Sequence, residues 1–538
     1  MVWISSISDR GVSGLLKFFS ALSKSPTNPQ AVRRPSAYDV AELFEGPVSV
    51  STDAAGAAAP LDEKVRQAYF WIVNHAIISP HYDIEYNSTP PAAFYIGDSG
   101  TRLTLPSAQS YSSFVLLPLL TFATRSKCLF VGGPGRGKTA SAILMGVLAG
   151  YAPREVRRAM QHGHPQMTIA DLLGNPLPAD LVSAQSMEDI RIAWRPWLSM
   201  RVKVIDEYNR IPTRTQSALL TVMGDNYAEV LGHLYECPEA AWYLTANDDA
   251  GGGTYQVIEA LRDRIDVIVQ ALSFNPRFLG ELLLRIEENV KPEEVVPPEI
   301  IFTPEELDQM VAEIRAVPVP EPVRHRIEFF ASQFELFESV GEQFEYMTKD
   351  TARLSRIDWG QSVAADQGRD RLKDLGCQTM NGLSVRNLMT LLKFAKALSW
   401  FRGTGEVELE DVRQVLPFVL NDKLHPDLDA PYFALPENAA FRTDRLSWLR
   451  ELFDASNAEY DRLNLDRDDP VGALSEQFEQ GLHGLEAGEV RSRLTRIERL
   501  VAELGKGRKL YGPLYDDLLK LKYLHQRYTN YLLWLRSR

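Results

Sequence analysis

The chain has 538 residues, of which 45% are hydrophobic and 24% charged, an ordinary composition for a globular protein with several domains. Its net charge of −13 argues against a general attraction to nucleic acid or to anionic membranes. The three cysteines exclude a disulfide framework, and no segment supplies the roughly 20 apolar residues of a membrane span. The N-terminus also lacks the pattern of a secretory signal, so we expect a cytoplasmic protein.

Residues 1–60 are predicted to form a helix and a flexible linker. Apolar side chains recur at near-helical spacing within residues 1–25, and proline-rich and alanine-rich stretches follow. A helix of this kind can dock on a partner or on a membrane surface. Packing on its own protein is the commoner role of such a stretch.

Between residues 61 and 272, apolar strand-like runs alternate with helical runs. This alternation predicts an α/β domain in which helices flank a parallel sheet. The apolar run 128–131 precedes a glycine-rich loop, and the helix-forming run 140–148 follows it. The loop matches the pattern G-x-x-x-x-G-K-[ST] and consists of Gly132, Gly133, Pro134, Gly135, Arg136, Gly137, Lys138 and Thr139.

This strand–loop–helix setting indicates a phosphate-binding loop rather than a chance match. Backbone amides of a glycine-rich turn at a helix N-terminus form a concave nest for phosphate oxygens. Lys138 would reach the β- and γ-phosphates, and the Thr139 hydroxyl would bind Mg²⁺. The chain is therefore predicted to bind a nucleoside triphosphate, and the base-recognising residues cannot be identified from the sequence.

Two histidines, His162 and His164, follow in a short segment that also contains Gly163 and Pro165. A metal site would need further ligands at suitable spacing, and the segment has none. We therefore interpret them as loop histidines.

A second apolar run, residues 202–206, ends in two acids, Asp206 and Glu207. A carboxylate at the end of a buried strand would lie beside the phosphate loop and could hold Mg²⁺. Glu207 would then orient or deprotonate the attacking water. Lys203 interrupts the run, which indicates a partly exposed strand face or an ammonium that reaches solvent.

The next strand candidate, residues 241–245, leads to Asn247. An amide at this place could hold the attacking water, although Asn-Asp also begins ordinary turns. Two other segments stand out as inserts in the domain. One follows Gly174, and the other, residues 227–237, has the pattern of a β-hairpin.

These segments together resemble the MoxR family of AAA+ ATPases. Residues 205–220 are similar to the family's DEINRAPPKTQSALLEAM stretch, and residues 245–264 to its TQNP…GTYPLPEAQLDRF stretch. Shorter matches to its T-x-x-DLxG, SPRA and PEDV segments lie at residues 168–174, 383–388 and 410–413. The resemblance covers roughly residues 110–425, with several motifs in order at family-like spacing.

The resemblance implies a role for each matching residue in the phosphate-binding half of the site. Lys138 and Thr139 would belong to the Walker A motif, and Asp206 and Glu207 to the Walker B motif. Asn247 would be the sensor 1 residue. The expected reaction is Mg²⁺-dependent hydrolysis of ATP to ADP and phosphate.

The resemblance also implies two arginines that stabilise charge on the transferring phosphoryl group. Arg264 matches the arginine finger, which completes the site of a neighbouring subunit. Arg262 is a second candidate for this role, and either arginine could instead be a surface residue paired with Asp263 or Asp266. Arg386 matches sensor 2, which reaches from the lid to the γ-phosphate.

Residues 273–425 are expected to form the α-helical lid of the family. Near residues 338–380 the chain is longer than in typical relatives and shows little sustained periodicity. An inserted hairpin or a mobile loop would account for this stretch. Phe329, Phe330, Phe334 and Phe337 recur at helical spacing, which indicates a core stripe.

Residues 426–538 form a C-terminal extension outside the resemblance and are expected to be helical. From Arg491 onward basic residues outnumber acids and aromatic residues are interleaved, which could suit nucleic acid. Leu494, Ile497, Val501 and Leu504 repeat at helical spacing, however. This repeat favours a helical hairpin that docks on its own ring or on a partner.

The family implies a ring-forming, chaperone-like ATPase, expected to be a hexamer, that remodels or activates a protein client. Lid closure would convert hydrolysis into movement of the inserts. Relatives often work with a von Willebrand factor A domain protein, and only the resemblance suggests that partner. Two other classes stay open: a nucleotide-dependent switch with low turnover, which Glu207 and Arg264 argue against, and a nucleic-acid motor, which the acidic total charge argues against.

Overall fold

The computed structural model describes residues 60–76, 81–86, 93–96, 101–104, 109–247, 257–272, 279–287, 291–340, 343–348, 375–463, 465, 469–504 and 512–537. The helix predicted within residues 1–25 and most of the predicted linker lie outside these ranges. No helix in the described ranges combines the length and the apolar character needed to cross a bilayer.

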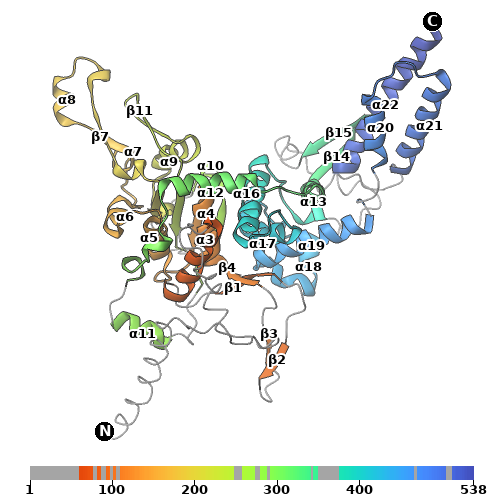
Figure 1. Ribbon diagram of the computed structural model, residues 1–538. Helices are drawn as coiled ribbons and strands as arrows, with labels where there is room; N and C mark the ends of the chain where they lie inside the picture. Colours follow the sequence, from red (N-terminus) through yellow and green to blue (C-terminus); the bar gives the residue numbers. More distant parts are fainter. Residues whose placement is uncertain are drawn as a thin grey trace. The chain divides into compact units, whose positions relative to one another are not determined.

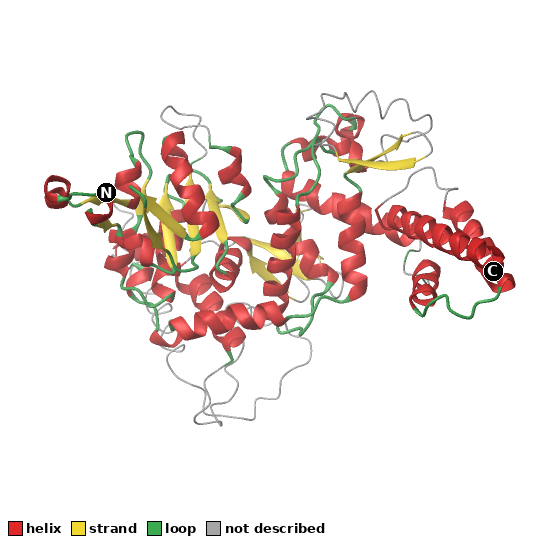
Figure 2. Cartoon of the chain, turned by 90° about the horizontal axis from the view of Figure 1, so that it is seen from above, coloured by secondary structure: helices red, strands yellow, loops and turns green. Residues whose placement is uncertain are grey.

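A parallel five-stranded sheet forms the centre of the nucleotide-binding half, with helices on both of its faces (Figure 2). Its strands, in spatial order, are β13 (Val267–Gln270), β5 (Lys127–Val131), β12 (Ala241–Ala246), β9 (Val202–Asp206) and β6 (Gln161–His162). All six residues of β12 are buried, as expected for a central strand of a sheet that is covered on both sides. The predicted parallel sheet flanked by helices is confirmed.

Figure 1 shows the helices around this sheet, among which α4 (Ser113–Thr124) is the most apolar. α4 packs on β5, β12 and β13, and nearly all of its residues are buried. The helix has no polar face because no side of it is exposed to solvent. Pro118 interrupts the hydrogen bonding of this helix without ending it, and the Pro118 carbonyl accepts a bond of 2.8 Å from the Tyr243 hydroxyl. The other helices of this half are α5 (Lys138–Leu148), α6 (Pro153–Ala159), α7 (Ile169–Leu173), α9 (Thr213–Asp225) and α10 (Glu259–Asp263).

The strands before residue 113 differ from the expected parallel arrangement. β1 (Tyr82–Tyr86) and β4 (Gln109–Ser112) form one antiparallel pair, and β2 (Ala93–Ile96) and β3 (Thr101–Thr104) form another. The connection between β2 and β3 is too short for the crossover that parallel pairing needs. The preceding helix, α3 (Leu61–Trp71), continues as one turn of π-helix, Ile72–Ala76.

Two inserts extend from the nucleotide-binding half. In the first, β7 (Gly174–Pro176) pairs with β8 (Ile192–Trp194), and the segment between them contains α8 (Pro178–Ser183). We call this the α8 arm. In the second, β10 (Tyr227–Val230) pairs with β11 (His233–Glu236), which gives the predicted β-hairpin.

The described part of residues 273–425, the predicted lid, is mainly helical, as expected. Its longer helices are α11 (Leu279–Glu287), α12 (Pro304–Ala316), α13 (Glu321–Ser332), α16 (Val385–Arg402) and α17 (Leu409–Leu420). Of the predicted stripe, Phe329, Phe330 and Phe334 are buried, and nothing is described of the Phe337 side chain. The chain after α13 forms an antiparallel hairpin of β14 (Glu335–Val340) and β15 (Gln343–Thr348). This finding favours the inserted hairpin, and residues 349–374 lie outside the described ranges.

The C-terminal extension is helical and divides between two hydrophobic cores. α18 (Pro431–Ala434) and α19 (Arg445–Leu463) contribute to the core that the lid and the sheet share. A second core lies among α20 (Pro470–Glu479), α21 (Ala487–Leu504) and α22 (Gly512–Ser537). Tyr528, one of the interleaved aromatic residues, is buried there and accepts a 2.9 Å hydrogen bond from Arg493. This packing favours the helical hairpin over a platform for nucleic-acid bases.

Candidate functional site

The glycine-rich loop connects the end of β5 to the start of α5. Gly135 and Gly137 have φ values of 72° and 79°, a backbone conformation that glycine adopts without steric cost. Gly132 lies so close to the end of β13 that a Cβ there would overlap the Ala271 carbonyl oxygen. The Arg136 guanidinium donates to that same oxygen over 3.1 Å, so the loop is fastened to the end of β13.

Lys138 is the most enclosed side chain of the loop, whereas residues 134–137 are exposed. Its ammonium donates to the backbone oxygens of Gly132 and Gly133 and, over 2.8 Å, to Oδ1 of Asn247. The loop lysine and the amide predicted to hold the water therefore meet directly. Their strands, β5 and β12, are neighbours that end at the same edge of the sheet.

The hydroxyl of Thr139 donates to Oδ1 of Asp206 over 3.0 Å, so the first residues of α5 lie against the end of β9. A third side chain joins them. Thr245 on β12 donates to the same Asp206 oxygen over 2.5 Å and accepts a 3.0 Å bond from the Glu207 backbone N–H. Thr245 thus fixes the backbone between the two acids.

Glu207 has a φ of 54°, a left-handed conformation that is unusual for a residue other than glycine. Its carboxylate accepts a 2.9 Å bond from Nδ2 of Asn247 and lies 3.3 Å from Nη1 of Arg210. The Gly163 N–H donates to the Asp206 carbonyl, and a Cβ on Gly163 would overlap the Glu207 carbonyl oxygen. Close approach of two backbones therefore requires glycine at position 163.

His162 lies on β6 opposite Asp206, and its Nδ1 is 3.5 Å from Oδ2 of that residue. The sequence interpretation of His162 as a loop histidine is wrong in this respect, because the β6 pairing brings it to the acid. The residues that sequence reasoning missed at this site are thus Thr245, Gly163, Arg210 and His162. Strand pairing places Thr245 and His162 at the site, and no local pattern in the sequence marks that pairing.

The oxygen atoms at the end of β9 suit a magnesium ion. Mg²⁺ prefers hard oxygen ligands and is usually held by one or two protein groups together with phosphates and water. The Thr139 hydroxyl and the Asp206 carboxylate provide such groups side by side. Within the described residues no cluster of three or more histidines, cysteines or acids forms a metal cage.

Arg264 lies at the opposite edge of the sheet from the phosphate loop. It lies between α10 and β13. Two residues later, the N–H of Asp266 donates to the carbonyl of Lys127, the first residue of β5, which places this segment at the start of that strand. The phosphate loop begins after the end of β5. The five residues of β5 span four steps of about 3.3 Å, so the two edges are about 13 Å apart. Arg264 donates to the Ala260 carbonyl over 3.2 Å and rests against Gly224 of α9.

The other two arginines are paired at that same edge. Arg262 forms a two-pronged ion pair with Asp422, just beyond α17. Arg386, at the start of α16, pairs with Asp263, the residue next to Arg264. The structure therefore brings together Lys138, Thr139, Asp206, Glu207 and Asn247, and it does not bring Arg264 or Arg386 to them within one chain.

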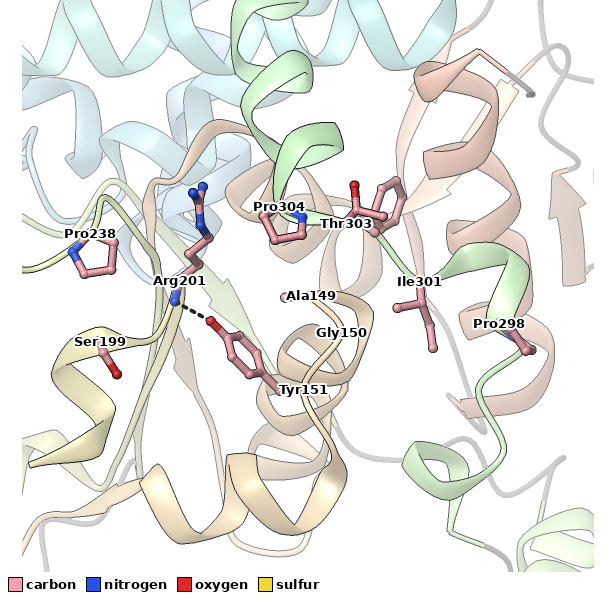
Figure 3. Close-up of a pocket in the computed structure, with 11 residues that line it drawn as sticks. Ala149, Gly150, Tyr151, Ser199, Arg201, Pro238, Pro298, Ile301, Thr303 and Pro304 are labelled. Carbon is pink, nitrogen blue, oxygen red and sulfur yellow. Dashed lines mark hydrogen bonds between the residues drawn. The ribbon is translucent and has the colours of Figure 1, made fainter. Parts of the chain in front are cut away.

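A separate cavity of about 630 Å³ lies where α5 ends and the lid begins, remote from the phosphate loop. Figure 3 shows Tyr151, Arg201 and several prolines around it, with the Arg201 N–H bonded to the Tyr151 hydroxyl over 3.0 Å. The Arg201 guanidinium also pairs with Asp308 over 2.7 Å. These contacts join the start of β9 to the end of α5 and to α12. None of the predicted site residues lines the cavity.

Comparison with known proteins agrees with the fold. Residues 127–267 match the ATPase family associated with various cellular activities (AAA), and residues 377–438 match the AAA lid domain. The predicted fold class is confirmed: an AAA+ domain with a parallel five-stranded sheet flanked by helices, then a helical lid and a helical C-terminal region.

Individual relatives are distant. The chain is 23% identical over 317 residues to the uncharacterized protein YeaC of Bacillus subtilis, which covers 58% of this chain and 82% of YeaC. A crystal structure of a "putative ATPase" from Cytophaga hutchinsonii is 19% identical, with a TM-score of 0.43. That match covers 63% of this chain and 89% of the Cytophaga chain.

Proposed function

We propose that this chain, which carries an AAA+ ATPase domain and its lid, is a MoxR-type ATPase that hydrolyses ATP in an oligomeric ring. In this proposal the ring remodels or activates a protein client in a chaperone-like way. A von Willebrand factor A domain protein is the expected partner, by the resemblance of the sequence motifs alone. A hexamer is the ring size we expect on the same ground.

The separation of the two groups of site residues carries the proposal. The five residues that we propose for nucleotide binding meet at one edge of the sheet. Hydrogen bonds of 3.0 Å or less join Lys138 to Asn247, Asn247 to Glu207, and Thr139 to Asp206. At the other edge, Arg386 pairs with Asp263, the residue that precedes Arg264 in the chain. Arginines that cannot reach their own nucleotide are suited to reach that of a neighbouring subunit, so the arrangement supports a site shared between subunits.

The proposed reaction is attack of water on the γ-phosphoryl group of ATP, which gives ADP and phosphate. The loop amides and Lys138 would bind the phosphates, and Mg²⁺ held by Thr139 and Asp206 would neutralise their charge. Glu207 would accept the proton of the water, and Asn247 would position that water. Because Asn247 bonds both Lys138 and Glu207, it is suited to sense whether a γ-phosphate lies between them.

Two arginines would stabilise the charge that develops on the transferring group. Arg264 of one subunit would enter the site of the next. Arg386, which pairs with the neighbouring Asp263, would act at the same boundary. The sequence motif implied that Arg386 reaches the γ-phosphate from the lid, and we propose that it does so across the subunit boundary.

The test is mass photometry with and without ATP and Mg²⁺, alongside phosphate release, for the wild type and Arg264→Ala. We expect nucleotide-dependent rings, and we expect Arg264→Ala to reduce turnover by about a thousandfold or more while it still binds nucleotide. Glu207→Gln should bind ATP, hydrolyse it poorly and accumulate as rings. A monomer whose turnover does not change in Arg264→Ala would contradict the shared site, and normal turnover in Glu207→Gln would exclude the catalytic assignment.

A further inference from the structure

Asp263 has partners on two separate segments of the lid. Its carboxylate pairs with the guanidinium of Arg386, at the start of α16, and lies 3.8 Å from the ammonium of Lys423, just beyond α17. The same ammonium donates to the backbone carbonyl of Asp263. Because Asp263 is the last residue of α10, these contacts fix the end of that helix against the lid.

The pairing with Asp263 restricts an arginine that would otherwise be free to move. The Arg386 side chain is 50% exposed, and a long exposed arginine has many rotamers of similar energy. Asp263 bonds the Nη1 atom of Arg386. A guanidinium carries five N–H donors in a planar fork, so the donors on Nη2 and Nε stay available to a second anion such as a phosphoryl group.

Arg264, the next residue after Asp263, is held in a different way. Its guanidinium donates to the Ala260 carbonyl over 3.2 Å, so a backbone oxygen and not a carboxylate orients it. Burial lowers the pKa of the nearby Lys127, and the positive charges of Arg386 and Arg264 lower it further. Both guanidinium groups therefore lie near the same lysine, and the negative charge of Asp263 offsets the repulsion between them.

We propose that Asp263 is a positioning residue for ATP hydrolysis in the neighbouring subunit. It holds Arg386 beside Arg264, so that both guanidinium groups face the neighbour's γ-phosphate. This inference rests on the proposed function, because it requires a site shared between subunits. Asp263 itself contacts neither the nucleotide nor the attacking water, and its effect on turnover passes through Arg386.

The first experiment is a double-mutant cycle on steady-state phosphate release, with Asp263→Ala, Arg386→Ala and the double variant. We expect Asp263→Ala to lower kcat about tenfold with little change in KM, since displacement of a catalytic group by about 1 Å can cost up to a hundredfold. The double variant should be no slower than Arg386→Ala, because the two residues act as a unit. Asp263→Asn keeps an acceptor for Arg386 and should lose less than Asp263→Ala.

Asp454→Ala is the matched control for the loss of an ion pair. Asp454 forms a two-pronged pair with Arg413 that joins α19 to α17, and it is 40% exposed, compared with 38% for Asp263. The control should keep full turnover, because neither of its partners belongs to the proposed site. Thermal midpoints of the two alanine variants should be similar, so that a loss of kcat confined to Asp263→Ala does not come from unfolding.

The second experiment mixes subunits to test whether Asp263 acts across the subunit boundary. Glu207→Gln subunits hydrolyse ATP poorly in their own site but keep Asp263 and both arginines. In rings assembled from equal amounts of Glu207→Gln and Asp263→Ala, about a quarter of the sites combine an intact glutamate with an intact neighbour. Turnover per subunit should rise from about a tenth of the wild-type value in Asp263→Ala rings to about a quarter in the mixture.

Action of Asp263 within its own subunit would instead lower the turnover of the mixture to about a twentieth of the wild-type value. Rings of Arg264→Ala mixed with Glu207→Gln in the same way are the reference for the shared site itself. An affinity tag on one of the two variants, with co-purification of the other, establishes that mixed rings form.

Rescue of Arg264→Ala without rescue of Asp263→Ala would overturn the inference and leave the proposed function intact. Full kcat in Asp263→Ala, or a double variant slower than Arg386→Ala, would overturn it as well. A rise of kcat in Asp263→Ala would show that the carboxylate competes with the phosphate for Arg386, which is the opposite of positioning. Rings shown to be mixed but without rescue in either mixture would reject the shared site, and the inference with it.

Discussion

Arg262 and Asp422 form a two-pronged ion pair that links the arginine-bearing end of α10 to the end of α17 in the lid. Two further contacts tie the same segment to the lid: Arg386 pairs with Asp263, and the Lys423 ammonium donates to the Asp263 carbonyl. Asp263 and Arg262, the two residues that precede the proposed finger, are thus both bonded to the lid. A lid movement in one subunit would therefore move Arg264 relative to the neighbour's nucleotide.

This pairing distinguishes the two finger candidates. We predict that Arg262→Ala and Asp422→Asn each lower turnover only a few-fold, whereas Arg264→Ala loses about a thousandfold or more. Because Arg262 and Asp422 act as a unit, the double variant should be no worse than either single variant. Steady-state phosphate release on the four proteins measures this. A loss in Arg262→Ala as severe as that in Arg264→Ala would instead make Arg262 the finger.

The placement of Arg264 depends on a glycine on another helix. A Cβ added to Gly224 would lie 2.8 Å from Nε and 3.2 Å from Nη2 of Arg264, so the guanidinium would have to shift. We predict that Gly224→Ala lowers kcat about tenfold or more, since displacement of a catalytic group by about 1 Å can cost up to a hundredfold. The thermal midpoint should not fall, because alanine stabilises a helix relative to glycine by about 0.5–1 kcal/mol.

Gly488→Ala is the matched control, because this glycine is also helical and exposed and a Cβ there meets open space. It should gain similar stability and keep full turnover. If Gly224→Ala has full turnover as well, the position of the Arg264 guanidinium over Gly224 does not matter for catalysis.

The parts of the candidate site that are formed by residues adjacent in the chain could be predicted from the sequence. The loop from Gly132 to Thr139 and the acids at 206 and 207 follow from local patterns, because a glycine-rich turn and an apolar strand each determine their own geometry. Asn247 was predictable for the same reason, since it directly follows a strand. The predicted parallel sheet likewise rests on apolar periodicity, whereas the helical lid was predicted from the resemblance of the sequence motifs.

The parts that depend on register or on distant segments were not predictable. Thr245 and His162 meet Asp206 only because β12 and β6 pair with β9 on its two sides. The partner of Arg262 lies 160 residues away in the lid, and the predicted alternative partners, Asp263 and Asp266, are not the ones it uses. Side-chain pairing across a fold leaves no periodic signal in either segment.

Thr245 provides a prediction for one of these unforeseen residues. Thr245→Val keeps the shape of the side chain but removes both bonds of the hydroxyl, to Asp206 and from the Glu207 N–H. Leaving such groups unpaired costs about 1–3 kcal/mol, and we expect kcat to fall about ten- to a hundredfold with a smaller change in KM. Thr245→Ser keeps the hydroxyl and should retain most of the activity. Equal losses in the two variants would show that packing, and not the hydroxyl, is what the site requires.

Lys203 gives a prediction about pH. The sequence suggested a partly exposed strand face or an ammonium that reaches solvent, but the side chain is only 1% exposed. Its ammonium donates to the Met200 carbonyl over 2.6 Å and lies 5.7 Å from the Trp242 ring. Burial lowers the pKa of Lys203 to about 8, whereas a lysine in an unfolded chain titrates near 10.4.

The sign of the effect follows from proton binding. Below about pH 8 the folded and unfolded chains both hold the proton, and folding bears the full cost of burying the ammonium. Between about pH 8 and 10 the folded chain has released the proton and the unfolded chain has not, so stability rises with pH by up to about 3 kcal/mol. Thermal midpoints of the wild type should therefore rise relative to those of Lys203→Met across this window. Lys522→Met, which removes an exposed lysine, should follow the wild type. Parallel curves for the wild type and Lys203→Met would mean that the buried ammonium is as well solvated in the fold as in water.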